Sequence, residues 1–485
     1  MKLMVVSTDK LTDLVVKKLR ENSASALEVT FHMGKADSDL RASTVRRMIV
    51  DQKSKRFMFD RSYLNNFSLK FSEDANFSDS LYKFVDHLYR SNKDIAVKAN
   101  NIEYIHEAYD YFYLAFDFIA GLMDEHKIDH VLFFNVPHLG YDTVCYEVAR
   151  FLRVKTTILS QSIFPGKYFS TSSADLFGRF NIDLNYHGDY KIDRAHLPDL
   201  FYMKGINSNS TPAKGISVLG FLSVLLYVII REPLLLVRLD KFLKILLRVS
   251  QIYRRTPKWR DPFAKFFNRR SLDYFEFISG VQSVEVDFKC QYVYFPLHLQ
   301  PEMTTSALGG PFVDQALAIE ILSSMLPENV KIYVKENPKQ MGFMRGPTFF
   351  HRINRLKNIE LIPENINSHE LIRNCVFVAA ITGTAGWEAL SIGRPALVFG
   401  NAWYRSLPGA VKYSEGLTYD EIIATKTSHE SLEKAVGQLH SRMHDGVIDR
   451  HYKGLVSGYN NDNNVVKIAE TIEKLISNNH PYTFD

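Results

Sequence analysis

The sequence predicts an α/β protein with two doubly wound domains, each a parallel sheet covered by helices on both faces. From residue 291 onward, short β-branched runs alternate with helical segments, and this alternation is typical of a doubly wound sheet. A related alternation occurs in the first 160 residues. The chain of 485 residues, 46% of them hydrophobic, is long enough for two substantial cores.

Apolar runs in the first part of the chain indicate the first Rossmann-like domain. Strands are expected at Leu3–Ser7, His130–Phe134 and Thr156–Leu159, and helices at Ile102–Asp124 and Thr143–Leu152. The apolar run at the N-terminus is too short for a secretory signal peptide, so we interpret it as the first buried strand. We expect this domain to cover residues 1–205.

A polar loop follows the expected strand His130–Phe134. It contains His138 and Asp142, four residues apart, at the carboxyl end of that strand. A histidine or carboxylate in such a loop can take a proton from a hydroxyl, and a carboxylate can act as a nucleophile. The alternative is structural, with Asp142 capping the next helix and His138 bonding the turn. Both residues are catalytic candidates.

The second domain is expected over residues 286–427, and its strands and helices alternate regularly. The expected strands are Tyr292–Pro296, Val330–Val334, Ile359–Ile362, Val376–Ile381 and Pro395–Phe399, and the expected helices are Val313–Met325, Pro347–Arg355 and Ser368–Arg373. In such a domain, ligands bind at the carboxyl ends of the strands.

Polar residues gather after three of these strands. Carboxyl ends of parallel strands lie at one edge of a sheet, so we expect the three loops to form one binding site. The candidate binding residues are His298, Gln300 and Glu302 in the first loop, Lys335, Glu336 and Asn337 in the second, and Thr382, Gly383 and Thr384 in the third.

The third loop leads from a buried strand into a helix. A helix N-terminus after a loop of small residues presents free N–H groups and the positive end of the helix dipole, which suits a phosphate. Glu388 is expected in the first helical turn, where it would hold sugar hydroxyls such as a ribose diol. The alternative is that Glu388 only complements the dipole and the glycines only form the turn.

An apolar and basic segment, residues 206–285, separates the two domains. Gly215–Ile230 carries no charge but is shorter than the roughly 20 residues that span a bilayer. A helix is expected at Leu234–Tyr253, with Arg238, Lys241, Lys244 and Arg248 on one face. Residues 231–260 hold nine Lys or Arg and two acids. Such a helix suits an anionic membrane surface, and the alternative is a helical hairpin packed on the protein itself.

The remaining features concern cysteines, ligands and the tail. Cys145, Cys290 and Cys375 are far apart, and we expect buried free thiols in a reducing cytoplasm. We expect no metal cluster and no cofactor, and nucleic acid is a poor partner because the basic segment lacks a known nucleic-acid-binding pattern. Residues 428–485 are expected to form helices.

Three motifs resemble one family. FPLHLQPEMTTSALGG, YVKENPKQ and ITGTAGWEALSIGRPALVFG are similar to the C-terminal half of bacterial capsule polysaccharide biosynthesis proteins, which include Kdo transferases of the two-domain GT-B glycosyltransferase fold. The resemblance covers Tyr292–Trp403, with a weaker echo at Asn135–Lys167. In this chain Asn337 stands where the family has a histidine, which leaves the donor type open.

The resemblance implies a metal-independent glycosyltransferase with the two domains facing a cleft. The first domain would bind the acceptor glycan or glycolipid, and the second would bind a nucleotide-sugar donor, CMP-linked donors included. Positive charge for the leaving phosphate would come from Lys335, backbone N–H groups or His298. By analogy the helix Asn464–Ile476 would cross back to the first domain. The protein would work in the cytoplasm, peripherally on the inner face of the cell membrane.

Three other functions remain open. A related transferase could move an alcohol phosphate into a teichoic-type polymer, because the fold and the basic helix suit it equally. A sugar epimerase of the same fold would not need the apolar and basic segment. A non-catalytic glycan-binding scaffold is favoured if neither His138 nor Asp142 matters.

Overall fold

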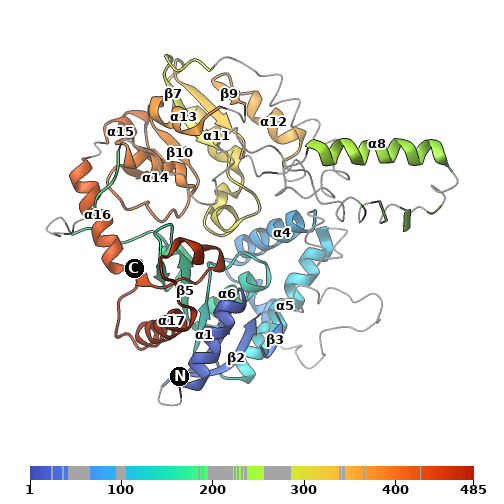
Figure 1. Cartoon of the computed structure of the whole chain (residues 1–485), viewed down its shortest axis with the longest axis vertical. Helices are drawn as coiled ribbons and strands as arrows, with labels where there is room; N and C mark the ends of the chain where they lie inside the picture. The colour runs from blue at the N-terminus through green and yellow to red at the C-terminus, as the bar shows by residue number, and fades with distance from the viewer. Residues whose placement is uncertain are drawn as a thin grey trace.

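The fold is seen in a computed structural model (Figure 1). It describes residues 1–22, 26–34, 38–41, 66–93, 105–183, 186, 188, 190–194, 222, 225–226, 229–230, 233, 238–255, 286–337, 340, 345–363, 366–425 and 428–485. Within these residues, two sheets lie in two halves of the molecule, one built from the first part of the chain and one from the later part.

The N-terminal sheet has seven strands in the order β13-β6-β5-β4-β1-β2-β3. The four pairs from β5 to β3 are parallel, and β6 is antiparallel to both β5 and β13. Its strands are β1 (Lys2–Val6), β2 (Glu28–Gly34), β3 (Leu40–Arg41), β4 (His130–Phe133), β5 (Lys155–Gln161), β6 (Lys167–Thr171) and β13 (His444–Asp445).

Alternate side chains of β1 pack into two different hydrophobic cores, one on each face of the sheet. Leu3 and Val5 pack with helices α1 and α17, whereas Met4 and Val6 pack with α5 and α6, as the period-two geometry of a strand requires. Helix α1 begins at Lys10 with a capping box formed by Asp9 and Thr12. The helices on this half are α1 (Lys10–Glu21), α3 (Phe67–Phe71), α4 (Phe77–Lys93), α5 (Ile105–Glu125), α6 (Tyr141–Phe151) and the 3₁₀ turn η3 (Ala174–Leu176).

The C-terminal sheet is parallel throughout, in the order β12-β11-β10-β7-β8-β9. Val293 and Phe295 of β7 face one core, and Tyr292 and Tyr294 face the other. The strands are β7 (Tyr292–Pro296), β8 (Lys331–Lys335), β9 (Ile359–Ile362), β10 (Val378–Ala380), β11 (Ala396–Val398) and β12 (Ala410–Lys412). Sheets buried on both faces give near-continuous apolar runs, and that pattern allowed the sequence to locate β7 to β11.

Helices cover both faces of this sheet, and two short helical turns follow β7. The helices are α11 (Gln315–Met325), α12 (Pro347–Asn354), α13 (Ser368–Asn374), α14 (Thr384–Ser391) and α15 (Tyr419–Ile423), and the turns are the π-helical η6 (Met303–Ala307) and the 3₁₀ η7 (Gly310–Val313). The predicted fold class, two Rossmann-like α/β sheets, is confirmed.

The last part of the chain returns to the N-terminal half. Helix α16 (His429–Arg442) runs between the halves, and α17 (Asn461–Ile476) lies beside α1 (Figure 1). Between them, a 3₁₀ turn η8 spans Arg450–Leu455. Near the end of the chain, Phe484 forms a parallel bridge with Thr171 of β6.

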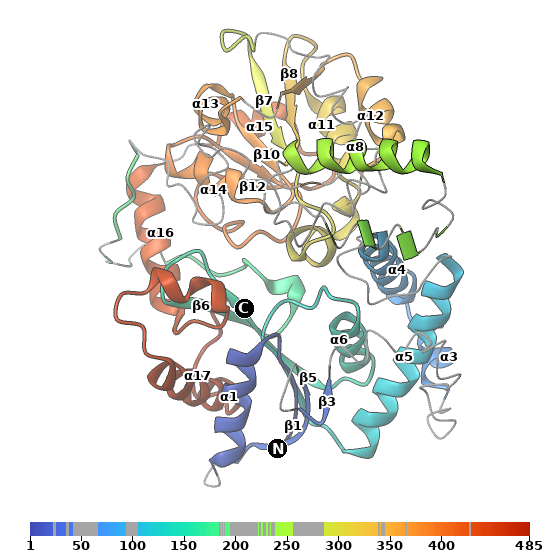
Figure 2. The same cartoon turned by 45° about the vertical axis from the view of Figure 1, so that its right-hand side comes forward.

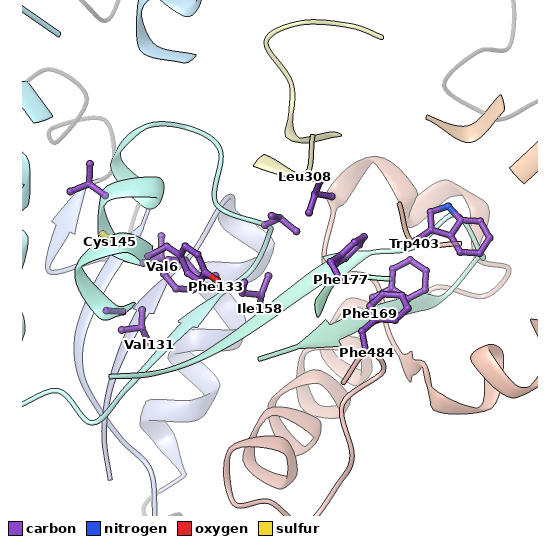
Figure 3. Packing of buried hydrophobic residues seen from close by; sticks show 14 of the residues in the cluster. Val6, Val131, Phe133, Cys145, Ile158, Phe169, Phe177, Leu308, Trp403 and Phe484 are labelled. Carbon is purple, nitrogen blue, oxygen red and sulfur yellow. The ribbon is translucent and has the colours of Figure 1, made fainter. Parts of the chain in front are cut away.

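One hydrophobic core is shared by the two halves. Phe169 of the N-terminal sheet stacks on Trp403, which follows β11, with ring centroids 6.0 Å apart. Phe484 packs on Phe169 at 4.9 Å, and Leu308 reaches the same core from the second domain. Figure 3 shows Phe169, Phe484 and Trp403 grouped together, with Leu308 above them. The domains are therefore joined by apolar packing as well as by the chain.

Helix α8 (Leu239–Arg255) projects to one side of the molecule in Figure 1 and lies in front of the C-terminal half in the view of Figure 2. None of its side chains from Leu239 to Leu247 is buried. Most of the predicted apolar and basic segment, including most of Gly215–Ile230, lies outside the described residues. Among the described helices, none combines the length and apolar character that a bilayer crossing requires.

Local details differ from the expectations in three places. The helix after the Asn135–Asp142 loop begins at Tyr141 rather than Thr143, so Asp142 lies inside it. Helix α14 begins at Thr384, which places Glu388 beyond the first turn. Cys145 and Cys375 are buried free thiols, but Cys290 is only partly buried.

Candidate functional site

The C-terminal sheet has a switch point between β7 and β10. The chain leaves β7 for β8 and β9 on one side and later returns to β10 on the other side of β7. Loops that depart in opposite directions from neighbouring strands leave a crevice, where open α/β sheets bind ligands. His298 follows β7, and Thr382–Thr384 follow β10. The fold therefore brings two of the three predicted site loops together.

His298 joins these two loops directly. Its Nε2 accepts hydrogen bonds from the backbone N–H of Gly383 at 2.7 Å and of Thr382 at 3.3 Å. A ring that accepts at Nε2 carries its proton on Nδ1 and is neutral. Burial, together with the Arg345 cation, lowers the pKa of His298 to about 3. The expectation that His298 supplies positive charge is wrong, because the ring is neutral at pH 7.

Gly383 allows the close contact between ring and loop. A Cβ at this position would lie 2.4 Å from His298 Nε2. Gly383 is also the N-cap of α14, and with no side chain it makes no capping bond to the first helical turn. The hydroxyl of Thr382 donates to the carbonyl of Thr304 at 2.6 Å, which ties the β10 loop to the turn after β7. Two of the amides expected to bind phosphate are thus occupied by His298.

Three buried polar side chains hold the backbone of the His298 loop. Gln315 accepts from the N–H of His298 at 2.8 Å and donates to its carbonyl at 3.1 Å. Gln340 makes the same pair of bonds with the backbone of Gln300, at 2.9 and 3.0 Å. Arg345 donates to the carbonyl of His298 and to Gln340. These bonds satisfy a buried loop backbone and fix its shape.

Sequence reasoning missed Gln315, Gln340 and Arg345. Gln315 is the first residue of a helix that is otherwise mainly apolar, and its burial there is a signal that a glutamine needs partners. Gln340 and Arg345 lie in a stretch between β8 and α12 that showed no periodicity, so nothing in the sequence pointed to them.

Glu336 and Glu302 have structural partners. The Oε2 of Glu336 lies 2.9 Å from the Nε of Arg345, with both side chains buried, and its Oε1 accepts from the N–H of Asn337 at 2.6 Å. Removing one member of a buried ion pair leaves an uncompensated charge. Glu302 accepts from the hydroxyl of Thr304 at the start of η6. Both carboxylates therefore help to hold the loops after β7 and β8.

Lys335 and Glu388 meet the same helix, α13. The ammonium of Lys335 donates to the carbonyl of Ile366 at 2.6 Å and to the hydroxyl of Ser368 at 2.9 Å. The next residue, His369, has its Nε2 3.8 Å from Glu388 Oε2. Both side chains are buried rather than exposed on loops as expected: Lys335 ends strand β8, and Glu388 lies in the second turn of α14.

Glu388 also faces two tyrosines. Burial and the charge of Glu388 raise the pKa of Tyr294 and of Tyr404. The hydroxyl of Tyr404 donates to the carbonyl of Gly383 at 2.5 Å, and that of Tyr294 donates to Ser368 at 3.4 Å. These bonds connect the surroundings of Glu388 with both the α14 N-terminus and the α13 N-terminus.

The N-terminal sheet has its own switch point, between β1 and β4. His138 lies after β4, and its Nδ1 donates to the carbonyl of Val136 at 2.7 Å, which orients the ring. Asp142 is buried, and its Oδ1 accepts from the N–H groups of Leu139 and Thr143 at 2.6 and 2.8 Å. The geometry of Asp142 matches the structural alternative, in which its carboxylate holds the loop and the helix start.

A small cavity of about 40 Å³ lies between the two domains. His138 lines it from the N-terminal side and Ser306 of η6 lines it from the C-terminal side. Asp142 is outside the lining. The other lining residues are Lys83, Pro137, Thr143, Tyr146, Glu147, Arg150, Ala174, Asp175 and Ala307.

The predicted site residues thus fall into three groups. His298, Thr382, Gly383 and Thr384 gather at the C-terminal switch point, where the bonds of Gln300, Glu302, Glu336 and Asn337 fix the loops. Lys335 and Glu388 lie around the start of α13. His138 lines the interdomain cavity from the N-terminal domain.

Comparison with known families tests the resemblance. Residues 253–445 match the family described as capsule polysaccharide biosynthesis protein. The predicted resemblance to this family is confirmed over these residues. This capsule-synthesis region, residues 253–445, includes the switch-point loops, α13 and α14. A role in capsule polysaccharide synthesis is the coarse function that the match supports.

The chain also has distant structural neighbours. A "beta Kdo 2,7 transferase", KpsC of Thermosulfurimonas dismutans, is 11% identical over 73% of this chain and 89% of that chain, with a TM-score of 0.30. Anabaena HepE in complex with UDP-glucose is 15% identical over 43% and 53%, with a TM-score of 0.22. The UDP-GlcNAc 2-epimerase of Methanocaldococcus jannaschii is 10% identical over 99% and 100%, with a TM-score of 0.21. No curated protein matches the chain.

Proposed function

We propose that this chain is a glycosyltransferase that moves a sugar from a nucleotide-sugar donor to a surface glycan or glycolipid. The observation that carries the proposal is a cavity between the two domains, which His138 lines from the N-terminal side and Ser306 and Ala307 of η6 line from the capsule-synthesis side. The turn that contains Ser306 is tied to the Thr382–Thr384 loop by the bond from the Thr382 hydroxyl to the carbonyl of Thr304. A donor on one domain and an acceptor on the other would meet between them.

The donor would lie along the N-termini of α13 and α14. With the N–H groups of Thr382 and Gly383 bonded to His298, the α14 N-terminus would favour the diphosphate or phosphate group through its helix dipole. Glu388 would accept hydrogen bonds from the ribose hydroxyls beside His369. Lys335 acts indirectly, because its ammonium holds Ile366 and Ser368. His298 is a positioning residue that sets the shape of the Gly383 loop.

The acceptor would approach from the N-terminal domain. His138 has one ring nitrogen committed to the carbonyl of Val136, and its ring lines the interdomain cavity. An oriented imidazole in that position suits contact with an acceptor hydroxyl. Asp142 would keep the loop in place rather than react.

A binding panel tests the donor part of the proposal. Thermal shift against CMP-, UDP-, GDP- and CDP-linked sugars, with a CDP-linked alcohol included, should identify one nucleotide class. Glu388→Gln should then weaken that ligand by roughly tenfold to a hundredfold in calorimetry, the scale of one lost charge-assisted bond. Glu370→Gln, an exposed carboxylate on α13, is the matched control. Binding of only the CDP-linked alcohol would favour an alcohol-phosphate transferase instead.

We further propose that the protein works at the cytoplasmic face of the membrane, held there by α8. Leu239, Leu243 and Leu247 recur every four residues and are 66%, 57% and 64% exposed. Lys241 and Lys244 are also exposed. An apolar stripe accompanied by cations matches an anionic lipid surface, which accepts both.

A further inference from the structure

One hydroxyl in the interdomain cavity lacks a partner. Ser306 of η6 is only 6% exposed, and its Oγ makes no hydrogen bond to any residue that the structure describes. The hydroxyl belongs to the cavity lining. A buried hydroxyl without a partner costs free energy unless a ligand or water satisfies it. This serine therefore marks a place where a polar atom from outside the protein would bind.

The size of the cavity limits what that atom belongs to. A volume of about 40 Å³ holds a water molecule or a few, since one water needs roughly 10–15 Å³ on this measure. It is too small for a whole sugar ring. A single hydroxyl or hydroxymethyl group entering from a larger ligand fits.

Glu147 lines the same cavity from the N-terminal domain. It projects from α6, and its side chain is 9% exposed. Its Oε2 accepts from the hydroxyl of Ser80 on α4 at 2.8 Å, and the NH1 of Arg150 lies 3.5 Å from the same oxygen. Burial raises the pKa of Glu147 above its ordinary value, with Arg150 and Ser80 opposing the change. The mechanism above makes no use of this carboxylate.

We propose that the cavity binds the attacking hydroxyl of the acceptor between Ser306 and Glu147, and that Glu147 receives its proton. This inference rests on the proposed glycosyltransferase function and identifies a catalytic residue for it. The acceptor oxygen forms a bond to the anomeric carbon as the bond from that carbon to the nucleotide phosphate breaks. The electron pair of the broken bond stays on the phosphate oxygen, and the hydroxyl proton goes to the carboxylate.

His138 is the competing proton acceptor in the cavity. Both residues line the cavity, and because the His138 Nδ1–H is donated to the carbonyl of Val136, Nε2 is the ring nitrogen that would take the proton. Glu147 is held by a serine hydroxyl that adjusts its proton affinity without blocking both oxygens. The charged or titratable groups that face Glu147 are Arg150 on α6, Lys83 on α4 and Asp175 on η3, with His138 in the loop after β4.

Water can replace the acceptor in the first experiment, because the cavity accommodates it. The readout is nucleotide release from the donor that the binding panel identifies. We expect Glu147→Gln to lower the release rate by about 10²- to 10⁴-fold, the scale of general base catalysis, with unchanged donor affinity. His138→Gln should lower it less. Asp124→Asn, a distant exposed carboxylate on α5, should leave it unchanged.

A pH profile separates catalysis from folding. The Ser80 hydroxyl stabilises the charged carboxylate, so Ser80→Ala should raise the pKa of Glu147 further. Because only the deprotonated form accepts a proton, the acid limb of the rate profile should move to higher pH in this variant. A purely structural defect would lower the rate without moving the limb.

Each outcome decides one proposal. Loss of release in Glu147→Gln together with the shifted limb in Ser80→Ala supports the assignment. Normal release in Glu147→Gln, or an acid limb that Ser80→Ala leaves in place, overturns it while the transferase function stands. Failure of the wild-type protein to bind any nucleotide sugar overturns the proposed function and this inference with it.

Discussion

At the scale of single residues, the contact between His298 and Gly383 leaves little room for a side chain at the glycine position. Gly383→Ala would place a Cβ 2.4 Å from the imidazole, so the ring must move and the two loops must separate. We expect a loss of about 1–3 kcal/mol in the free energy of unfolding and weaker nucleotide binding. Urea unfolding and calorimetry would measure both.

A matched glycine controls for the extra methyl group. Gly454→Ala in η8 adds a Cβ that meets no atom within 4 Å, and it should change neither quantity. If Gly383→Ala behaves like Gly454→Ala, the close packing of His298 on the loop is not needed for the site.

Three buried histidines predict how stability depends on pH. Burial lowers the pKa of His298 to about 3 and those of His130 and His444 to about 4. The unfolded chain binds protons near pH 6.5, whereas the folded protein does not. Stability should therefore fall as pH drops from about 6.5 toward 4, by up to about 1.4 kcal/mol per pH unit for each histidine.

Urea unfolding at pH 7.5 and pH 5 would test this dependence. His444→Gln should make the fall in stability shallower, because the unfolded state then gains one proton fewer. His451→Gln, at an exposed position, should leave the slope unchanged. Equal stability at the two pH values would show that these histidines titrate alike in the folded and unfolded states.

At the scale of elements, α8 carries the membrane proposal. Changing Arg238, Lys241, Lys244 and Arg248 to Glu should release the protein from anionic liposomes, because each cation adds about 1 kcal/mol of attraction. Salt should weaken the wild-type attachment by screening, whereas contact through the leucine stripe should resist salt. Flotation of wild-type protein free of anionic liposomes at low salt would refute the attachment.

How far the sequence predicts each element depends on its surroundings. Tyr292–Pro296 was located to the residue, because a strand buried on both faces leaves a clear apolar run. Ile359–Ile362, a partly buried strand at the edge of the same sheet, was also located to the residue. Strand β13 has two residues and pairs with a distant partner in β6, so no local pattern could reveal it. Most of the site residues that the sequence predicted lie at or near strand ends, where polar residues follow one another. Arg345 was missed because it lies in a stretch without periodicity between β8 and α12, and its bond to the carbonyl of His298 joins residues 47 positions apart.

The burial of Lys335 and Glu388 also depends on contacts between distant parts of the chain, which the local sequence does not reveal. Their positions after a strand and in a helix were predictable, but the direction of each side chain depends on α13, which follows β9. Loop placement alone therefore identified the right region and assigned Lys335 a role that its bonds to Ile366 and Ser368 do not support.

At the scale of the whole molecule, the domain interface can be tested at Gly178. A Cβ there would lie 1.9 Å from the carbonyl oxygen of Ala402 in the other domain, and the residue has a φ of +80°. Gly393 has a φ of +84° and open space around it. Gly393→Ala should cost only the strain of a positive φ, about 1–2 kcal/mol. Gly178→Ala should cost clearly more, and thermal unfolding would compare the two.

If the two variants have the same unfolding temperature, the interface accommodates the added methyl group and contributes little to stability. If Gly178→Ala instead splits one unfolding transition into two, the apolar contact is what makes the domains unfold together.

The hydrophobic core that the two domains share lies at one side of the molecule and would act as the pivot between them. On that side, Trp403, Phe169 and Phe484 form a dry contact that sliding or separation would expose to water. On the other side, α4 and η6 face each other across the polar cavity. We therefore expect any relative motion of the domains to be a rocking about the aromatic side that widens the gap near Ser306. A ligand would enter and leave the cavity along the α4 edge. Bulky substitutions at that edge should therefore slow the exchange of the ligand without contacting the bound donor.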